Sequence, residues 1–302
     1  TGDLVPLSRT ETAEATVRLA VPPEATPVET NYGDLARLVA YQVSPNPPVP
    51  GQPLRLILHW QATNRIEFDL HQSVKLLDTA GNPVSELDQV PPVPTSQWWP
   101  GDVISDTLLV PIKADIPRPT ALGLDIGLTL LDTQRALPAF NRQGEEIPRI
   151  VTRLSIPAAV DPDLQNARIL DYIFDDSLAL VAMEPAEMDP EAPGEALVLR
   201  LFWRALAPVP DDYTVFLHVV DASGQVVAQG DGPPVNGQYP ISAWSAGELI
   251  ADDRRISLPA ELPPGEYQLL VGLYRPVDGQ RLPVTSETDG RNAAPLSSVV
   301  IP

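Results

Sequence analysis

Hydrophobic and polar positions alternate with a period of two along several short segments of this chain. In residues 197–204, the side chains of Leu197, Leu199, Leu201 and Trp203 fall on one side and the four intervening side chains fall on the other. This period is typical of a β-strand, because successive side chains on a strand point to opposite faces of its sheet. Helical periodicity is hard to find. The pattern predicts an all-β protein.

The proline content supports the same fold class. Of the 302 residues, 36 are proline, which is more than twice the usual share of about 5%. Proline is excluded from helix interiors and central strands but is accepted at strand ends, sheet edges and turns. A chain rich in proline and in runs of Val, Leu and Ile is therefore expected to form β-sheet with many corners.

The chain contains two altered copies of one module. Residues 51–60 (GQPLRLILHW) match 194–203 (GEALVLRLFW), and 74–81 (VKLLDTAG) match 217–224 (LHVVDASG), each 143 residues later. Further matches follow in the same order: Trp98 with Trp244, Gly101 with Gly247, Gly127 with Gly272, and the closing segment 153–157 with 298–302. Two copies are too few for a solenoid, so tandem domains are predicted.

Each copy has room for about seven strands, which is the number expected of an immunoglobulin-like or fibronectin-like β-sandwich. The expected organisation is an N-terminal strand and Pro-rich linker at 1–30, module one at 31–157, a linker at 158–166 and module two at 167–302. We therefore expect two tandem β-sandwich domains.

The openings of the two modules indicate a difference in length. Residues 36–41 (ARLVAY) resemble 167–172 (ARILDY), and this match leaves about a dozen additional residues in module two, within 175–193. An extra edge hairpin is the favoured interpretation of this segment, and a binding loop is the alternative.

Charge and cysteine usage exclude several function classes. The net charge is −20, from 40 acidic and 20 basic residues, whereas nucleic acids and anionic membranes require basic patches. The acidity is interpreted as a solvated surface, with clusters of acids that bind calcium as the alternative.

The absence of cysteine excludes further function classes. Without cysteine there is no disulfide, thiolate catalysis or Cys-ligated zinc. We predict no metal, no cofactor and no nucleic-acid partner.

Membrane insertion by this sequence is not expected either. No apolar stretch approaches the roughly 18 residues that cross a bilayer. The sequence begins at Thr1 rather than at methionine, so a fragment of a longer protein is expected.

Two recurring pairs of carboxylates are candidates for catalytic groups. Asp102 with Asp106, and Glu248 with Asp252, recur in both modules at a spacing of four residues. On a strand this spacing separates the two acids by about 13 Å, whereas glycosidase carboxylates lie about 5–9.5 Å apart. A structural role is therefore favoured over a hydrolase. No catalytic residue is predicted, because no other catalytic motif occurs.

The tryptophans divide into two groups. Trp60 and Trp203 lie on the inward face of predicted strands and are expected in the cores. Trp98, Trp99 and Trp244 lie in loops rich in Pro, Gly and Ser, where an indole ring could stack on a sugar. Because Trp98 and Trp244 recur at matching positions, a role in anchoring the loop is favoured for them over sugar stacking.

The candidate ligand-binding residues are Trp244, Tyr239, His218, Asp231 and Trp99. His218 and Asp231 occur in module two alone, and are therefore free to serve function rather than the shared fold. We expect the four candidates of module two to converge on one exposed surface. For His218 considered alone, a structural histidine is the favoured alternative, because such a role is the common case for a histidine in the middle of a strand.

Residues 216–284 resemble a C-terminal module of bacterial, Chloroflexi-type membrane glycosyltransferases related to protein mannosyltransferases. The resemblance is carried by His218, Asp231, Tyr239-Pro240, Trp244, Gly247-Glu248, Asp252, Pro264-Gly265-Glu266-Tyr267 and Gly272-Leu273-Tyr274. Module one matches less closely, because it lacks the His, the Tyr-Pro and the Leu-Tyr. The resemblance implies an extracytoplasmic appendage. In that family the reaction belongs to a multi-pass membrane portion absent from this sequence, so no catalytic residue carries over.

The expected function is a non-catalytic extracytoplasmic binding or accessory module, at the cell surface, of a larger membrane-anchored bacterial protein. A glycan, or the membrane portion of the parent protein, is the expected partner. A structural spacer or protein-interaction domain is the first alternative, and a hydrolase is the less favoured one.

Overall fold

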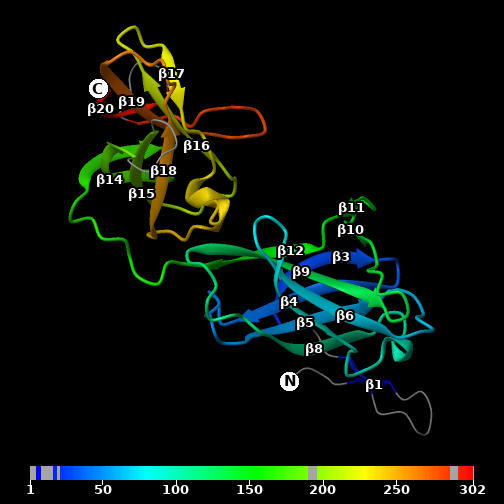
Figure 1. The fold of residues 1–302 in the computed structure, drawn as a ribbon. Helices are drawn as coiled ribbons and strands as arrows, with labels where there is room; N and C mark the ends of the chain where they lie inside the picture. The colour runs from blue at the N-terminus through cyan, green and yellow to red at the C-terminus, as the bar shows by residue number, and fades with distance from the viewer. Residues whose placement is uncertain (1–4, 8–15, 19–20, 190–195, 286–291, 302) are drawn as a thin grey trace. The chain divides into compact units, whose positions relative to one another are not determined.

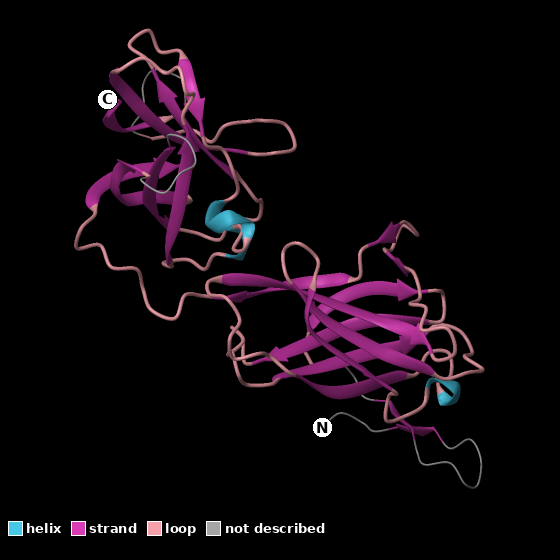
Figure 2. Ribbon diagram, in the orientation of Figure 1, coloured by secondary structure: helices cyan, strands magenta, loops and turns pink. Residues whose placement is uncertain are grey.

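The structure is a computed structural model that describes residues 5–7, 16–18, 21–189, 196–285 and 292–301. These residues are almost entirely β-strands joined by turns and loops, with three short 3₁₀-helices, η1 (Thr95–Gln97), η2 (Pro234–Gly237) and η3 (Ile241–Ala243) (Figures 1 and 2). The all-β class predicted from the alternation of side chains is confirmed.

The chain divides between Ile156 and Pro157 into two compact units, apart from residues 118–121, which group with the second unit. Unit one includes the strand β3 (Thr26–Tyr32), which covers most of the expected Pro-rich linker. The assignment of 26–30 to a linker is therefore wrong, because these residues pair with the neighbouring strand β4 (Ala36–Ser44).

Unit one is built from two larger sheets and a short hairpin (Figure 1). The six-stranded sheet has the order β11 (Glu146–Ile147), β10 (Ala139–Phe140), β3, β4, β5 (Leu54–Ala62) and β8 (Val103–Val110). The four-stranded sheet has the order β12 (Ile150–Ile156), β9 (Thr120–Leu130), β6 (Leu70–Leu77) and β7 (Pro83–Gln89). The hairpin pairs β1 (Val5–Leu7) with β2 (Thr16–Arg18).

Unit two is built from two four-stranded sheets. The first has the order β13 (Arg168–Phe174), β14 (Leu178–Met188), β15 (Ala196–Ala205) and β18 (Leu249–Ser257). The second has the order β17 (Val226–Gln229), β16 (Thr214–Val220), β19 (Gly265–Tyr274) and β20 (Ala294–Ile301). Each unit is thus a β-sandwich.

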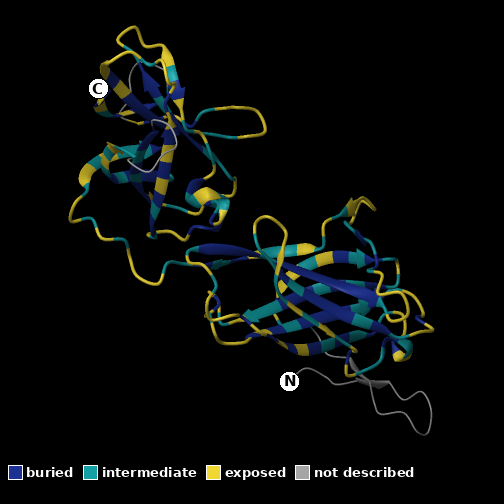
Figure 3. Ribbon diagram, viewed as in Figure 1, coloured by how far each residue is buried: buried dark blue, intermediate teal, exposed yellow. Residues whose placement is uncertain are grey.

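The core of unit two lies between its sheets, as the alternation of side chains predicts. Leu197, Leu199, Leu201 and Trp203 are buried in one cluster with apolar side chains from the opposite sheet (Figure 3). Burying a side chain of this size stabilises the fold by about 1.5–3 kcal/mol. Phe202, which points to the other face, is also buried, in a separate small cluster. Trp60 is fully buried in the core of unit one, as expected.

Strand pairing corrects the match between the openings of the two modules. In unit one β4 lies beside β5, and in unit two β14 lies beside β15. The counterpart of 38–41 (LVAY, in β4) is therefore 180–183 (LVAM, in β14), at an offset of 142 residues. The predicted match of 36–41 with 167–172 is wrong, because the latter segment begins β13, the counterpart of β3.

The segment 175–193 is consequently not an extra hairpin. It contains the tight turn after β13 and the whole of β14, which pairs with β13 on one side and β15 on the other. Residues 190–193 lie outside the described part of the chain. The corrected register places Tyr32 against Trp60 and Phe174 against Trp203, with ring centroids 5.3 and 5.6 Å apart.

Candidate functional site

Trp98 and Trp244 anchor their own loops. Each indole Nε1 donates a hydrogen bond to the backbone carbonyl five residues earlier, at 2.8 Å to Val93 and at 3.0 Å to Tyr239. Trp98 is fully buried and Trp244 is 4% exposed. The stretch that the modules share around these tryptophans therefore closes one end of each core. The use of Trp244 as a sugar-stacking surface is excluded by its burial.

The first acid of each recurring carboxylate pair caps the same loop. Asp102 Oδ2 accepts a hydrogen bond from the backbone N–H of Trp99 at 3.0 Å, and Glu248 Oε2 accepts one from Ser245 at 2.9 Å. Glu248 also accepts a hydrogen bond from the hydroxyl of Tyr239 at 3.0 Å. These contacts agree with the structural role that the sequence favours for both acids.

The second acid of the pair in unit one is buried in a side-chain network. Gln72 Nε2 donates to Asp106 Oδ2 at 2.6 Å, and Trp60 Nε1 donates to Gln72 Oε1 at 2.8 Å. Burial raises the pKa of Asp106, and the hydrogen bond from Gln72 opposes that rise. The acid is thus held by a network that begins at the core indole of Trp60.

The corresponding acid of unit two has a different partner. Val215 stands at the position of Gln72, and the carboxylate of Asp252 instead lies 3.7 Å from the guanidinium Nη1 of Arg254. The backbone N–H of Val235 donates to Asp252 Oδ1 at 2.9 Å. Desolvation raises the pKa of Asp252 to about 6, although Arg254 opposes the shift. Asp252 has no exposed surface, in agreement with burial as the main cause of the raised pKa.

The predicted ligand-binding residues separate into three places. Tyr239 is fully buried and packs in the same core as Trp244, so the expectation that four residues of module two converge on one exposed surface is wrong. His218 and Asp231 do lie together, with 3.6 Å between Nε2 and Oδ1. Trp99, in unit one, is 41% exposed. The rings of Tyr239 and Trp244 are buried because their loop folds back over the end of the core.

His218 lies on the outer face of β16, beside a small apolar cluster. Its ring centroid is 4.8 Å from that of Phe216, over which the guanidinium of Arg281 lies at 4.2 Å. Desolvation lowers the pKa of His218, Asp231 opposes this shift, and Arg281 adds to it. These contacts fit the alternative of a structural histidine.

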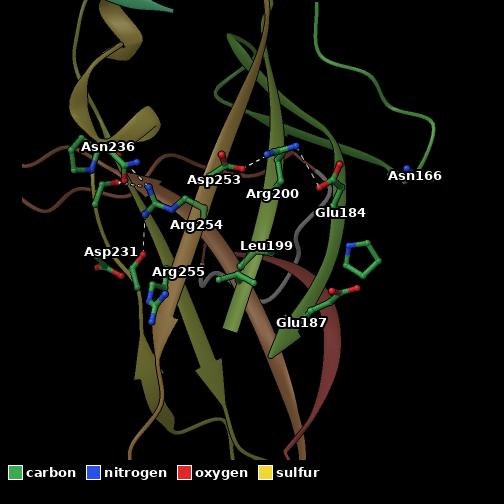
Figure 4. Close-up of a pocket in the computed structure, with 15 residues that line it drawn as sticks. Asn166, Glu184, Glu187, Leu199, Arg200, Asp231, Asn236, Asp253, Arg254 and Arg255 are labelled. Atoms are coloured by element: carbon green, nitrogen blue, oxygen red, sulfur yellow. Dashed lines mark hydrogen bonds and ion pairs between the residues drawn. The ribbon is translucent and has the colours of Figure 1, made fainter. Parts of the chain in front are cut away.

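An open groove of about 980 Å³ lies on unit two, over the outer faces of β14, β15 and β18 and beside residues 230–236 (Figure 4). Its charged lining consists of four acidic and three basic side chains: Glu184, Glu187, Asp231, Asp253, Arg200, Arg254 and Arg255. Asp231 is thus the one predicted site residue that lines it. The charged side chains of the lining are close to balance, and apolar side chains stand between them.

Arg200 organises one side of the groove. It stands on β15, opposite Asp253 on β18 and Glu184 on β14. Its Nε lies 2.5 Å from Asp253 Oδ1, and its Nη1 lies 3.7 Å from Glu184 Oε2. Figure 4 shows the guanidinium between the two carboxylates. Both partners restrict the rotamers of Arg200, so its donors are held in place before any ligand arrives.

Arg254 builds the opposite wall. Its Nη2 donates to the carbonyls of Gly230 at 2.9 Å and Val215 at 3.2 Å, and its Nη1 donates to those of Gly232 and Pro233, both at 3.2 Å. One guanidinium therefore ties four carbonyls to β18 and fixes the loop. Gly230 is needed there, because an added Cβ would lie 2.8 Å from the backbone of β18.

Sequence reasoning missed most of this groove. Arg200 could be identified as outward-facing from the strand period, but its partners Glu184 and Asp253 lie on strands that are distant in sequence. The contact between these three side chains depends on the order of the strands in the sheet, which no local sequence pattern encodes. The available signal was a row of charged residues at outward positions of a predicted strand.

Metal binding receives no support from the described residues, among which no group of three or more His, Asp or Glu side chains could hold an ion. In the same part of the chain, no helix is long and apolar enough to cross a membrane.

Comparison with known proteins assigns no family, because no family model matches the sequence and no curated protein is significantly similar to it.

Proposed function

We propose that this chain is a non-catalytic binding module whose second unit holds a neutral, polyhydroxylated ligand, a glycan, in the groove beside β18. The observation that carries the proposal is the nearly balanced set of charged groups in the lining, in which Arg200 is fixed between Glu184 and Asp253. Sugar hydroxyls both donate and accept hydrogen bonds, so a surface that alternates guanidinium and carboxylate groups is complementary to them.

The overall charge supports a neutral ligand. A chain with a net charge of −20 repels anions, and the groove itself carries nearly as many arginines as acids. A cationic ligand would be bound by acidic side chains without ionic partners, whereas Glu184 and Asp253 are paired with Arg200 and Asp231 lies beside His218. A polar ligand without charge fits the lining best.

The absence of catalysis is part of the proposal. The recurring acids are used for loop capping and core networks, and the groove carboxylates Glu184 and Asp253 contact one guanidinium. A glycosidase requires two carboxyl groups placed on either side of the scissile bond, whereas these two acids lie on either side of the Arg200 side chain. The resemblance of 216–284 to the glycosyltransferase module adds the proposal that this unit serves a larger membrane-anchored bacterial protein outside the cytoplasm.

Glycan-array screening of the full chain, followed by calorimetric titration with the strongest hit, tests the proposal. Arg200→Met should weaken binding about tenfold or more, because it removes the donors and unpairs two carboxylates. Arg55→Met, at an outward position of β5 in unit one, is the matched control and should leave the affinity unchanged. If no glycan on the array is bound, the proposal fails and a spacer function becomes the better description.

A further inference from the structure

The loop that precedes η3 is longer in unit two than its counterpart in unit one. Glu86 on β7 and Gln229 on β17 take the same place beside β6 and β16, at an offset of 143 residues. The carbonyls that accept the indole hydrogen bonds, those of Val93 and Tyr239, are 146 residues apart. Unit two therefore has three additional residues in the loop 230–238, which borders the groove.

The backbone of this longer loop is strained. Val235, Asn236 and Gly237 have φ angles of 51°, 51° and 80°, all in the left-handed region. Glycine enters this region freely and asparagine tolerates it, but a β-branched residue such as valine rarely adopts it. Strain of this kind persists only where the surrounding structure enforces it, and it gathers at ligand-binding and active sites.

Two buried charged side chains of β18 enforce the strained conformation. The backbone N–H of Val235 donates to Asp252 Oδ1 at 2.9 Å. Arg254 Nη1 donates to the carbonyls of Gly232 and Pro233, just before the strained residues. Asp252 has no exposed surface and Arg254 is 7% exposed, so water competes little for these bonds. The loop is therefore fixed in place before any ligand binds.

The fold does not require this arrangement. Unit one also forms a sandwich, but with the shorter loop, and Leu108 stands where unit two has Arg254. The longer loop and the buried ion pair of Asp252 with Arg254 thus occur together, in one unit. A buried ion pair seldom stabilises a fold more than apolar side chains of the same size. Its presence under a strained loop therefore indicates that the position of the loop matters for function.

Asn236 is the residue that this loop presents to the groove as a neutral polar group. Of the five loop residues in the lining, it has the one uncharged polar side chain, and it is exposed. Asp231, the charged loop residue of the lining, lies 3.6 Å from His218. Figure 4 shows Asn236 on the loop side of β18 and Arg200 on the other side. A ligand that lies over β18 therefore has the guanidinium on one side and the amide on the other.

We propose that Asn236 is the specificity-determining residue of the groove, and that its amide binds two neighbouring hydroxyl groups of one hexose ring. The side chain offers an N–H donor and a carbonyl acceptor in one plane, so it accepts from one hydroxyl and donates to the next. Because the backbone beneath it is fixed, the direction of the amide is set in advance. This inference rests on the proposed glycan-binding function and assigns the choice among sugars within it.

Calorimetric titration of the full chain with trisaccharides of glucose, of mannose and of galactose, all with the same linkage, tests the assignment. Mannose and galactose each differ from glucose in the orientation of one hydroxyl group. The wild type should prefer one trisaccharide about tenfold or more, because a misplaced hydroxyl leaves a polar group unpaired. Asn236→Gly, which removes the amide and adopts the same φ freely, should weaken binding of that trisaccharide about tenfold and of the others little. Gln238→Ala, at an exposed amide of the same loop outside the lining, is the matched control and should keep the preference.

The outcomes separate this inference from the proposed function. If Asn236→Gly keeps the wild-type preference while Arg200→Met loses affinity, the groove binds glycans but Asn236 does not select them. An equal loss of affinity for all the trisaccharides would also overturn the inference, because Asn236 would then support the loop without contacting the sugar. A wild type that binds all of them alike, or none of them, would overturn it too. If the glycan array gives no hit either, the proposed function fails as well.

Discussion

Asp252 and Arg254 form a buried ion pair in unit two, at the positions where unit one has Asp106 and Leu108. Both units bury an acid on the strand after the tryptophan loop, and each supplies a different partner. Unit one uses the amide of Gln72, and unit two uses the guanidinium two residues along the same strand. The substitutions are coupled, because an isolated buried carboxylate would be strongly destabilising.

Arg254→Leu should destabilise unit two by about 3–5 kcal/mol, because it leaves Asp252 buried without its cation and removes the donors to four carbonyls, three in the loop and one on β16. The double variant Arg254→Leu/Val215→Gln, which recreates the arrangement of unit one, should recover part of that loss. Urea denaturation followed by tryptophan fluorescence measures both. A single variant as stable as the wild type would mean that the pair contributes little.

Asp252 should also make stability depend on pH. Its folded pKa of about 6 exceeds the value of about 3.9 expected in the unfolded chain. Below about pH 4 the acid is protonated in both states, and its contribution is fully present. As the pH rises from about 4 to 6 the unfolded state ionises first, so about 3 kcal/mol of stability is lost.

The test is to compare Asp252→Asn with the wild type over this pH range. The variant should lose less stability between pH 4 and pH 7, because its side chain does not titrate. Asp253→Asn, at the next and exposed position, is the control and should follow the wild-type profile more closely. Parallel profiles for Asp252→Asn and the wild type would contradict the assignment.

Gly127 and Gly272 occupy the same position on β9 and β19, yet alanine should affect them differently. A Cβ on Gly272 would overlap the ring of Phe216 and lie 2.9 Å from the carbonyl oxygen of Asn292. A Cβ on Gly127 would meet only the flexible side chain of Arg149, at 2.7 Å from Nη1. Gly272→Ala should therefore cost about 1–3 kcal/mol and Gly127→Ala clearly less. Thermal unfolding of the two variants measures the difference, and equal losses would refute the explanation.

Trp244→Phe should change stability without changing glycan affinity. The smaller ring leaves a cavity and loses the hydrogen bond to the carbonyl of Tyr239, so a loss of about 1–3 kcal/mol is expected. Trp98→Phe should behave in the same way in unit one. Calorimetric titration at a temperature where both variants are folded measures their affinities. A weakened affinity in either variant would show that the substituted tryptophan contributes to glycan binding.

The fold class and the duplication could be predicted from sequence because their signals are local. The alternation around Trp203 and the recurrence of Trp98 as Trp244 each depend on a few neighbouring residues. The start of each module could not be predicted, because β-strand patterns look alike in several registers and only hydrogen-bonded partners distinguish them. A chance resemblance of 36–41 to 167–172 therefore outweighed the correct match.

The candidate site was harder to predict than the fold. Tyr239 and Trp244 were expected to be exposed because they lie in a loop rich in Pro and Gly, but burial depends on how that loop folds over the core. Arg200 acquires its role from strands that are distant in sequence. Of the three loop tryptophans only Trp99 is exposed, and its counterpart in unit two, Ser245, is not aromatic.

The offset between the units changes along the chain, from 142 at β4 and β14 to 143 at β5 and β15 and 146 at β8 and β18, and returns to 145 at β9 and β19. The later changes fall between strands, whereas the first falls within β14, at an irregularity between Glu184 and Glu187 that β4 lacks. A one-residue insertion within a regular strand would turn its remaining side chains from the core to the solvent, and a β-bulge avoids this by leaving the extra residue unpaired. The two copies thus preserve a record of their divergence, in which length changed at the connections between strands and at one bulge.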